Sequence, residues 1–181
     1  AVLTRPDHPS GSDRVFEAVT AVDPRRVHDV VVNVQGDLPI IAPAAIRAAL
    51  VPLDDASVEI ATLAAPIKDP AEIASPSIVK VAAGFADGAR VAPALYFSRL
   101  GVPWGEGAHF HHIGVYAYRR AALERFVTLP PSPLERREGL EQLRALEAGI
   151  RIAVALVDAV PLGVDTPEDL ARARALARDE T

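Results

Sequence analysis

The stretch that decides the fold is Val30-Val31-Val32-Asn33-Val34, which runs directly into Gln35-Gly36-Asp37. Its first five residues are nearly all apolar and β-branched, a pattern typical of a strand buried on both faces of a parallel sheet. The three residues that follow are typical of the turn that ends such a strand. The sequence therefore predicts an α/β fold.

Helices and strands are predicted on both sides of this stretch. Apolar residues at helical spacing, behind a Ser-Gly-Ser loop, predict a helix over about 12–22. The other expected strands are 59–65, 78–83, 91–97, 113–118 and 150–157, and the other expected helices are 44–50, 132–148 and one that begins at 166. Because no repeat or linker divides the chain, we expect a single domain over 1–181.

Two of these helices open on recognisable capping motifs. Ser132-Pro133-Leu134-Glu135 places Ser at the N-cap and Glu three residues later, which is a capping box, and Gly149 is placed to end that helix. Thr166-Pro167-Glu168-Asp169 has the same form with Asp in the third position. Both motifs are therefore explained by structure alone.

The composition excludes several functions. Half of the 181 residues are apolar, which is enough for a substantial core. The net charge of -5 gives no attraction for nucleic acid or for an anionic membrane surface. The chain has no cysteine, no apolar run near the roughly 18 residues of a membrane span, and no signal peptide in 1–10. We expect a cytoplasmic protein with no nucleic-acid or membrane partner.

Two carboxylates are candidates for a Mg²⁺ site. Asp37 follows the most strand-like segment, and ligands of open α/β sheets bind beyond the carboxyl ends of strands. Asp165 precedes the cap residue Thr166 and is not needed for capping. Each has a structural alternative: Asp37 as a turn residue with a local hydrogen bond, and Asp165 as a partner of the helix dipole.

Further candidates lie in a loop, a strand and a helix. The segment from Ser10 to Arg14 could bind an anion at a helix start, or Ser10 or Ser12 could simply cap that helix. Polar side chains that could bind a sugar or a carboxylate gather around the 101–112 loop and on the helix after residue 132, where a polar stripe is usually only solvated. They are Arg99, His112, Tyr116, Glu138, Glu141 and Gln142.

Seven ordered segments together resemble the 3-deoxy-manno-octulosonate (Kdo) cytidylyltransferase family, also called CMP-Kdo synthetases. They are LTRPDHPSGSDR at 3–14, VNVQGDLP at 32–39, ALYFSR at 94–99 with PW at 103–104, HIGVY at 112–116 with YR at 118–119, SPLE at 132–135, LEQLR at 140–144 and GVDTPEDL at 163–170. The resemblance covers nearly the whole chain.

The resemblance implies a nucleotide-diphospho-sugar transferase fold, a three-layer sandwich with a mixed, mostly parallel sheet. It also implies transfer of CMP from CTP to Kdo, giving CMP-Kdo and pyrophosphate for lipopolysaccharide assembly, by a cytoplasmic homodimer. By similarity, Asp37 and Asp165 would be the catalytic residues that hold Mg²⁺, and Arg99 would meet the sugar carboxylate. The nucleotide would be bound by Ser10, Gly11, Ser12 and Arg14, and the sugar by Gln35, Arg99, His112, Tyr116, Glu141 and Gln142.

Two departures from the family accompany this resemblance. The family's first strand-helix-strand unit, with its triphosphate-binding loop, does not precede Ala1, and the chain contains no methionine. The loop after Trp104 is also short. We therefore expect these 181 residues alone to have little or no activity, although removal of a Met-Ala start would also explain the first residue. The alternatives are a cytidylyltransferase for another sugar acid, such as a nonulosonic acid, and a non-catalytic remnant that binds sugar or a partner subunit.

Overall fold

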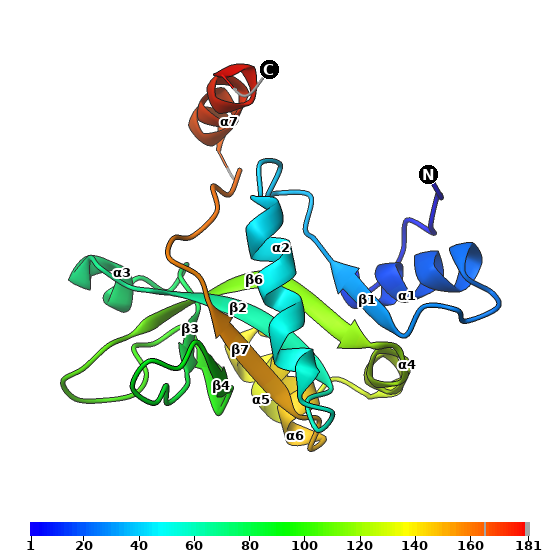
Figure 1. Ribbon diagram of the computed structural model, residues 1–181, viewed down its shortest axis with the longest axis horizontal. Helices are drawn as coiled ribbons and strands as arrows, with labels where there is room; N and C mark the ends of the chain where they lie inside the picture. The colour runs from blue at the N-terminus through cyan, green and yellow to red at the C-terminus, as the bar shows by residue number, and fades with distance from the viewer. Residues whose placement is uncertain (165, 180–181) are drawn as a thin grey trace.

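The computed structural model describes residues 1–164 and 166–179, and within them seven strands form one sheet with helices on both faces (Figure 1). The strands are β1 Val30–Asn33, β2 Ile60–Pro66, β3 Lys80–Ala82, β4 Val91–Pro93, β5 Tyr96–Ser98, β6 Phe110–Arg119 and β7 Ile152–Leu156. The helices are α1 Gly11–Val22, α2 Pro43–Leu50, α3 Pro70–Ala74, α4 Arg120–Thr128, α5 Pro133–Glu138, α6 Gln142–Glu147 and α7 Pro167–Asp179, with a 3₁₀ helix at Val51–Asp54. Among the described residues no helix is long and apolar enough to cross a membrane.

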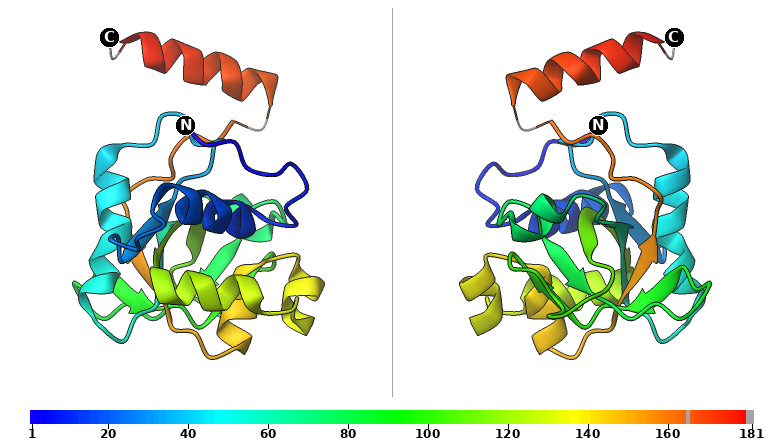
Figure 2. Two further views of the ribbon diagram at one scale, coloured as in Figure 1. Left: turned by 90° about the vertical axis from the view of Figure 1, so that its right-hand side faces the viewer. Right: turned by 90° about the vertical axis from the view of Figure 1, so that its left-hand side faces the viewer.

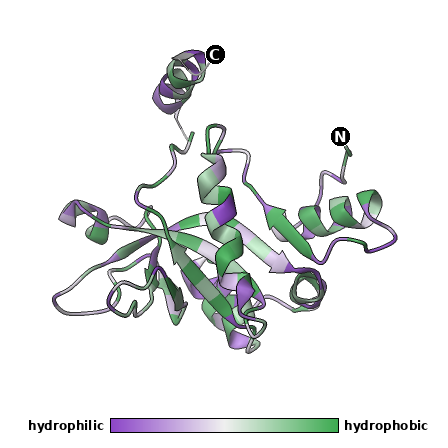
Figure 3. Ribbon diagram, viewed as in Figure 1, coloured by the Kyte–Doolittle hydropathy of each residue, from purple (hydrophilic) through white to green (hydrophobic). Residues whose placement is uncertain are grey.

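The sheet is mixed, as expected, but it is not mostly parallel. The main path runs β4-β7-β2-β6-β3-β5, and β1 pairs with β6 on the edge opposite β2. Among the described pairings, β2 with β7 alone is parallel. The apolar run at β1, coloured hydrophobic in Figure 3, predicted the strand correctly, but Val30 and Val32 are only partly buried, and an apolar run does not fix the direction of a neighbouring strand. Its described neighbour, β6, runs antiparallel to it.

Helices cover the sheet in two separate layers (Figure 2), which confirms the three-layer expectation. On one face α2 packs on β2, β6 and β7, where Ala49, Leu63 and Val115 are fully buried. On the other face α4 and α6 cover β6 and β5, and the larger core there includes Phe97 and Leu123. The α7 helix stands apart from the sheet (Figure 1).

Two expected elements are divided in the structure. The expected helix 132–148 is α5 and α6, separated at Gly139, which adopts φ 66° and caps α5 in the left-handed conformation. The expected strand 91–97 is β4 and β5, because β4 pairs with β7 while β5 pairs with β3. The α3 and α4 helices were not predicted.

The predicted capping motifs are confirmed. Ser132 and Glu135 exchange both hydrogen bonds of the capping box. Thr166 Oγ1 accepts a hydrogen bond from Asp169 N, and Thr166 N donates to Asp169 Oδ2, at 3.1 and 3.2 Å. Gly149 has φ 73° just after the last turn of α6, as its role as a stop requires.

A buried ion pair joins α1, the start of β1 and α4. Arg120 Nη1 lies 2.5 Å from Asp23 Oδ2, and both side chains are less than a tenth exposed. The backbone N–H groups of Val27 and His28 also donate to this carboxylate. These hydrogen bonds, with that from Val27 the largest cause, lower the pKa of Asp23 to about 2. The pair therefore fixes how the first helix meets the sheet.

We expect Asp23→Asn to lower the melting temperature by several degrees, because it leaves the buried guanidinium of Arg120 without its charge partner. The folded pKa of about 2 lies below the ordinary value of 3.8, so this stabilisation is complete above pH 4. It should shrink as the pH falls from about 4 to about 2. Thermal melts of both proteins across that range measure the difference. Asp7→Asn, which removes an exposed pair with Arg5, is the control and should change little. A constant difference at every pH would contradict the assignment.

Candidate active site

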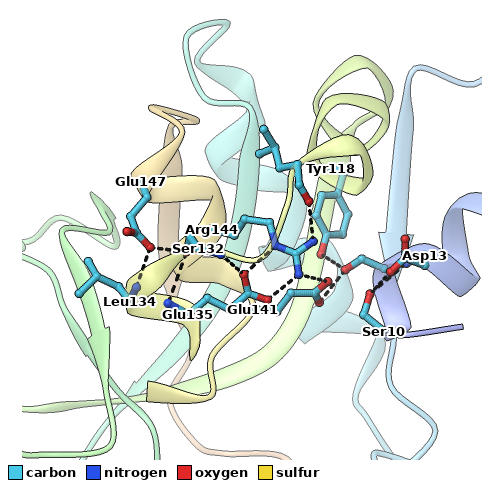
Figure 4. Close-up of polar contacts among 11 residues, drawn as sticks. Ser10, Asp13, Tyr118, Ser132, Leu134, Glu135, Glu141, Arg144 and Glu147 are labelled. Carbon is cyan, nitrogen blue, oxygen red and sulfur yellow. Dashed lines mark hydrogen bonds and ion pairs between the residues drawn. The ribbon is translucent and has the colours of Figure 1, made fainter. Parts of the chain in front are cut away.

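A cleft of about 470 Å³ opens between the start of α1 and the α5–α6 pair. Its wall includes members of both predicted segments, Ser10 from the nucleotide segment and Glu141 from the sugar segment. Figure 4 shows these side chains facing one another across the cleft. The other lining residues are Pro9, Asp13, Val127, Leu129, Pro131, Glu135, Arg136, Gly139 and Arg144. The predicted nucleotide segment and the predicted sugar segment, which are far apart in the sequence, thus line one cleft.

The predicted nucleotide segment is the first turn of α1. Ser10 is the N-cap: its Oγ accepts from Asp13 N at 3.2 Å and donates to Asp13 Oδ2 at 2.6 Å. Gly11 faces open space. Arg14 Nη1 donates to Thr4 Oγ1 at 2.8 Å and fastens the loop before the helix. Capping by Ser10 is thus confirmed, and binding of a nucleotide by this turn stays a prediction.

Ser12 connects the nucleotide segment to the sugar segment directly. It is buried, and its Oγ donates to Glu141 Oε2 at 3.1 Å and lies 3.4 Å from Tyr118 Oη. The other carboxylate oxygen, Glu141 Oε1, is buried and has no hydrogen-bond partner among the described residues. A buried carboxylate oxygen without a donor is costly, and sugar binding by Glu141 stays a prediction.

Arg144 does not satisfy this oxygen because Glu135 holds it elsewhere. Arg144 Nε and Nη2 donate to the two oxygens of Glu135 at 2.8 and 2.5 Å, whereas Nη2 is 3.9 Å from Glu141 Oε1. The guanidinium also lies over the ring of Phe126. The hydrogen bonds between Glu135 and Arg144 lower the pKa of Glu135 and raise that of Arg144. The pair was not predicted, because Glu135 was interpreted only as the third residue of a capping box.

His112 and Tyr116 lie on either side of an irregularity in β6. The register with β2 shifts after Thr62, so Gly114 and Val115 bulge from β6. Thr62 Oγ1 can donate its single hydrogen to the carbonyl of Val115 at 2.8 Å, and it lies 3.0 Å from His112 Nε2. Nε2 then donates, and Nδ1 is left as an acceptor.

Burial sets the charge of both rings. It lowers the pKa of His112 to about 3, with nearby His111 as the second cause, so the imidazole is neutral at pH 7. Burial also raises the pKa of Tyr116 well above its ordinary value, and the two ring centroids are 5.5 Å apart. Buried Gln142 lies with Tyr116 along a small pocket next to Glu141. Three predicted sugar residues and Glu141 are therefore gathered in one region.

Gln35 and Asp37 lie beyond the end of β1, as predicted. The Nε2 of Gln35 is 3.9 Å from where a β-carbon would stand at Gly114, so this side chain lies over the β6 bulge. Asp37 is exposed, and no described residue bonds to its carboxylate. Its backbone carbonyl accepts from Val164 N at 2.8 Å, which brings the segment ending at residue 164 against Asp37.

Asp165 itself lies outside the described residues. Within 1–164 and 166–179, no three His, Cys, Asp or Glu side chains gather in a way that could hold a metal ion. The exposed carboxylate of Asp37 has the hard oxygen donors that Mg²⁺ prefers and no competing partner in the described chain. The chemistry of Asp37 therefore fits the predicted ion, and the assignment of Mg²⁺ stays a prediction.

Arg99 is not part of the cleft wall. Its Nε donates to the carbonyl of Glu138 at 2.9 Å and its Nη1 to the carbonyl of Pro76 at 3.0 Å. Its Nη2 lies 3.9 Å from where a β-carbon would stand at Gly139, which does line the cleft. The structure thus places Arg99 directly behind Gly139.

The break between α5 and α6 leaves Glu138 on a different helix from Gln142, so the expected polar stripe does not exist.

Comparison with known proteins agrees with this geometry. A family model described as cytidylyltransferase matches residues 1–152. A 3-deoxy-manno-octulosonate cytidylyltransferase of Azorhizobium caulinodans is 66% identical over 176 residues, which are 97% of this chain and 70% of the relative. The enzyme of the same name from Rhodospirillum centenum is 64% identical over 100% of this chain and 70% of its own length.

Solved structures support the same assignment. A CMP:2-keto-3-deoxy-manno-octonic acid synthetase complexed with CTP is 40% identical, with a TM-score of 0.86, and the match covers 99% of this chain and 73% of that one. An apo UDP-glucose pyrophosphorylase at 12% identity, with a TM-score of 0.65, shares the fold alone over 100% of this chain and 64% of its own. On these matches, the chain belongs to the cytidylyltransferase family and, within it, to the 3-deoxy-manno-octulosonate cytidylyltransferases.

Proposed function

We propose that this protein transfers CMP from CTP to Kdo and releases pyrophosphate, making CMP-Kdo for lipopolysaccharide biosynthesis. The observation that carries the proposal is the 66% identity to a Kdo cytidylyltransferase over 97% of the chain. The cleft adds physical support, because Ser12 from the nucleotide segment is bonded to Glu141 from the sugar segment. A reaction that joins two substrates needs their binding residues to meet in this way.

The residues of the chain would mainly bind and orient the two substrates. The anomeric hydroxyl oxygen of Kdo forms a bond to the α-phosphorus of CTP and gives its proton to water, while the bond from that phosphorus to the bridging oxygen breaks and pyrophosphate leaves with its electron pair. Glu141 Oε1 and His112 Nδ1 would accept hydrogen bonds from sugar hydroxyls. The guanidinium of Arg99 would hold the sugar carboxylate. The chain has no cysteine, so direct transfer is simpler than a covalent enzyme intermediate.

Mg²⁺ is part of this proposal through Asp37 and Asp165. When bound, the ion would neutralise charge on the phosphates of CTP. Support comes from the exposed carboxylate of Asp37 and from the bond between Asp37 and Val164, which is adjacent to Asp165 in sequence. The contribution of Asp37 itself is to present hard oxygen ligands at the end of β1.

We further propose that the protein is a cytoplasmic homodimer. The loop after β5 exposes two large apolar side chains, Trp104 at 99% and Leu100 at 74%. Exposed apolar surface of this kind favours association with another protein surface. The chain's net charge of -5 favours neither nucleic acid nor an anionic membrane as the partner.

Pyrophosphate release from CTP should depend on Kdo and on Mg²⁺. It is measured with Kdo or Mg²⁺ omitted in turn, and with a nonulosonic acid in place of Kdo. Turnover that needs neither Kdo nor Mg²⁺ would contradict the proposal. A preference for a nonulosonic acid over Kdo would support the alternative substrate, and sugar binding without turnover would support the non-catalytic alternative.

Glu141→Gln should raise the KM for Kdo about tenfold, the effect of losing one hydrogen bond that involves a charged group. The KM for CTP should change much less. The melting temperature should not fall, since the change removes a charge whose buried Oε1 has no hydrogen-bond donor in the described chain. Steady-state kinetics and a thermal melt measure both effects, and Glu106→Gln in an exposed loop is the control. An unchanged KM for Kdo would remove Glu141 from the sugar site.

Asp37→Ala should abolish Mg²⁺-dependent turnover and leave the melting temperature nearly unchanged. The carboxylate is exposed and bonds to no described residue, so the fold loses nothing when it is removed. Turnover is titrated against Mg²⁺, and Asp54→Ala in the 3₁₀ helix serves as the matched carboxylate control. Full activity of the Asp37 variant at saturating Mg²⁺ would reject the metal assignment.

A further inference from the structure

Lys80 is fully buried, and its ammonium group is bound by backbone carbonyls alone. Nζ donates to the carbonyls of Ser75 at 2.8 Å, Ile78 at 2.7 Å and Arg99 at 2.6 Å. These bonds use its three protons. None of the described carboxylates forms an ion pair with it.

Burying this charge is expensive, so its position calls for an explanation. Desolvation is the main cause that lowers the pKa of Lys80, and the nearby cation Arg99 lowers it further. An apolar side chain in β3 would fill the same core without that cost. What Lys80 adds is a fixed geometry for three carbonyls that come from two separate segments of chain.

Those carbonyls lie at the backbone of Arg99 and in the turn that contacts its guanidinium. One belongs to Arg99 itself, directly after β5. The other two, from Ser75 and Ile78, bracket Pro76, whose own carbonyl accepts the hydrogen bond from Arg99 Nη1 at 3.0 Å. Lys80 therefore fixes the backbone of Arg99 and also the turn that receives its guanidinium.

Glu138 completes the arrangement from the end of α5. Its Oε2 accepts from Arg99 N at 3.0 Å, its backbone carbonyl accepts from Arg99 Nε at 2.9 Å, and its Oε1 accepts from Ser98 Oγ at 3.0 Å. With Nε and Nη1 engaged, Nη2 is the nitrogen on the side of Gly139 and the cleft. The guanidinium is thus held in one orientation before any ligand binds.

We propose that Lys80 and Glu138 are positioning residues that fix Arg99 in the orientation needed to bind the carboxylate of the sugar substrate. The inference rests on the proposed function, in which Arg99 meets that carboxylate. Neither residue contacts the substrate. They set the geometry beforehand, which lowers the entropy cost of the contact between the Arg99 guanidinium and the sugar carboxylate.

The first test observes Arg99 without any substrate. In wild-type protein the Nε–H of Arg99 is hydrogen-bonded, so its ¹⁵N–¹H signal should exchange slowly with water. Lys80→Met and Glu138→Gln should each make that exchange at least about tenfold faster, because each removes a contact that holds Arg99 in place. Lys80→Arg, which keeps a charged donor, should restore part of the protection. Val81→Ala, at the next buried position of β3, is the control for loss of stability and should not change the signal.

The second test measures the preference of the active enzyme for Kdo over the Kdo carboxamide. This preference is the ratio of kcat/KM for the two compounds. Arg99→Ala defines the full loss of that preference. Lys80→Met and Glu138→Gln should lower it about tenfold with the KM for CTP unchanged, and Val81→Ala should not.

The outcomes separate the two proposals. If Arg99→Ala keeps the full preference, the role of Arg99 in the proposed function is wrong, whatever the exchange rates show. If Arg99→Ala loses the preference while folded Lys80→Met and Glu138→Gln keep both the preference and the slow exchange, the positioning inference is overturned. The positioning inference is also overturned if Val81→Ala changes the exchange rate and the substrate preference as much as Lys80→Met and Glu138→Gln do. Should Lys80→Met fail to fold, Glu138→Gln and Lys80→Arg decide the question.

Discussion

The pairing of β6 is the constraint on which the rest of the structure depends. It is hydrogen-bonded to β1 and β2 on its two edges and to β3 near its start, so its position in the sheet is fixed along its length. The bulge opposite Thr62 would leave carbonyls without partners, and the Thr62 hydroxyl lies within hydrogen-bonding distance of two of them. Because this repair also engages His112, the same contacts that hold the sheet orient a ring of the candidate site.

Most charged groups with buried atoms have partners among the described residues. Asp23 pairs with Arg120, Glu135 pairs with Arg144, and Lys80 donates to three carbonyls. Two charged groups keep a buried atom without a hydrogen bond: Arg120 Nε, which lies 3.5 Å from the carboxylate of Glu124, and Glu141 Oε1, which belongs to a residue of the cleft wall. Natural folds break such local rules mainly where a ligand will complete them. The unsatisfied oxygen therefore points to the cleft as a site of binding rather than of stability.

Local signals in the sequence predicted much of the fold and less of the site. The caps at Ser10 and Ser132 and the strand at β1 follow from residues within a few positions of one another, so they could be found without the structure. The division of 91–97 could not, because it depends on which distant strand each half pairs with. The parallel direction assumed for the sheet failed for the same reason. The resemblance supplied residue identities, but the links from Lys80 to Arg99 and from Ser12 to Glu141 join positions far apart in the chain.

The bond between Ser12 and Glu141 links the two predicted binding segments through one side chain. One oxygen of the carboxylate accepts from Ser12, and the other accepts from no described residue, because Arg144 is held by its bidentate contact with Glu135. A displacement of the first turn of α1 would therefore either shift Glu141 or break this bond.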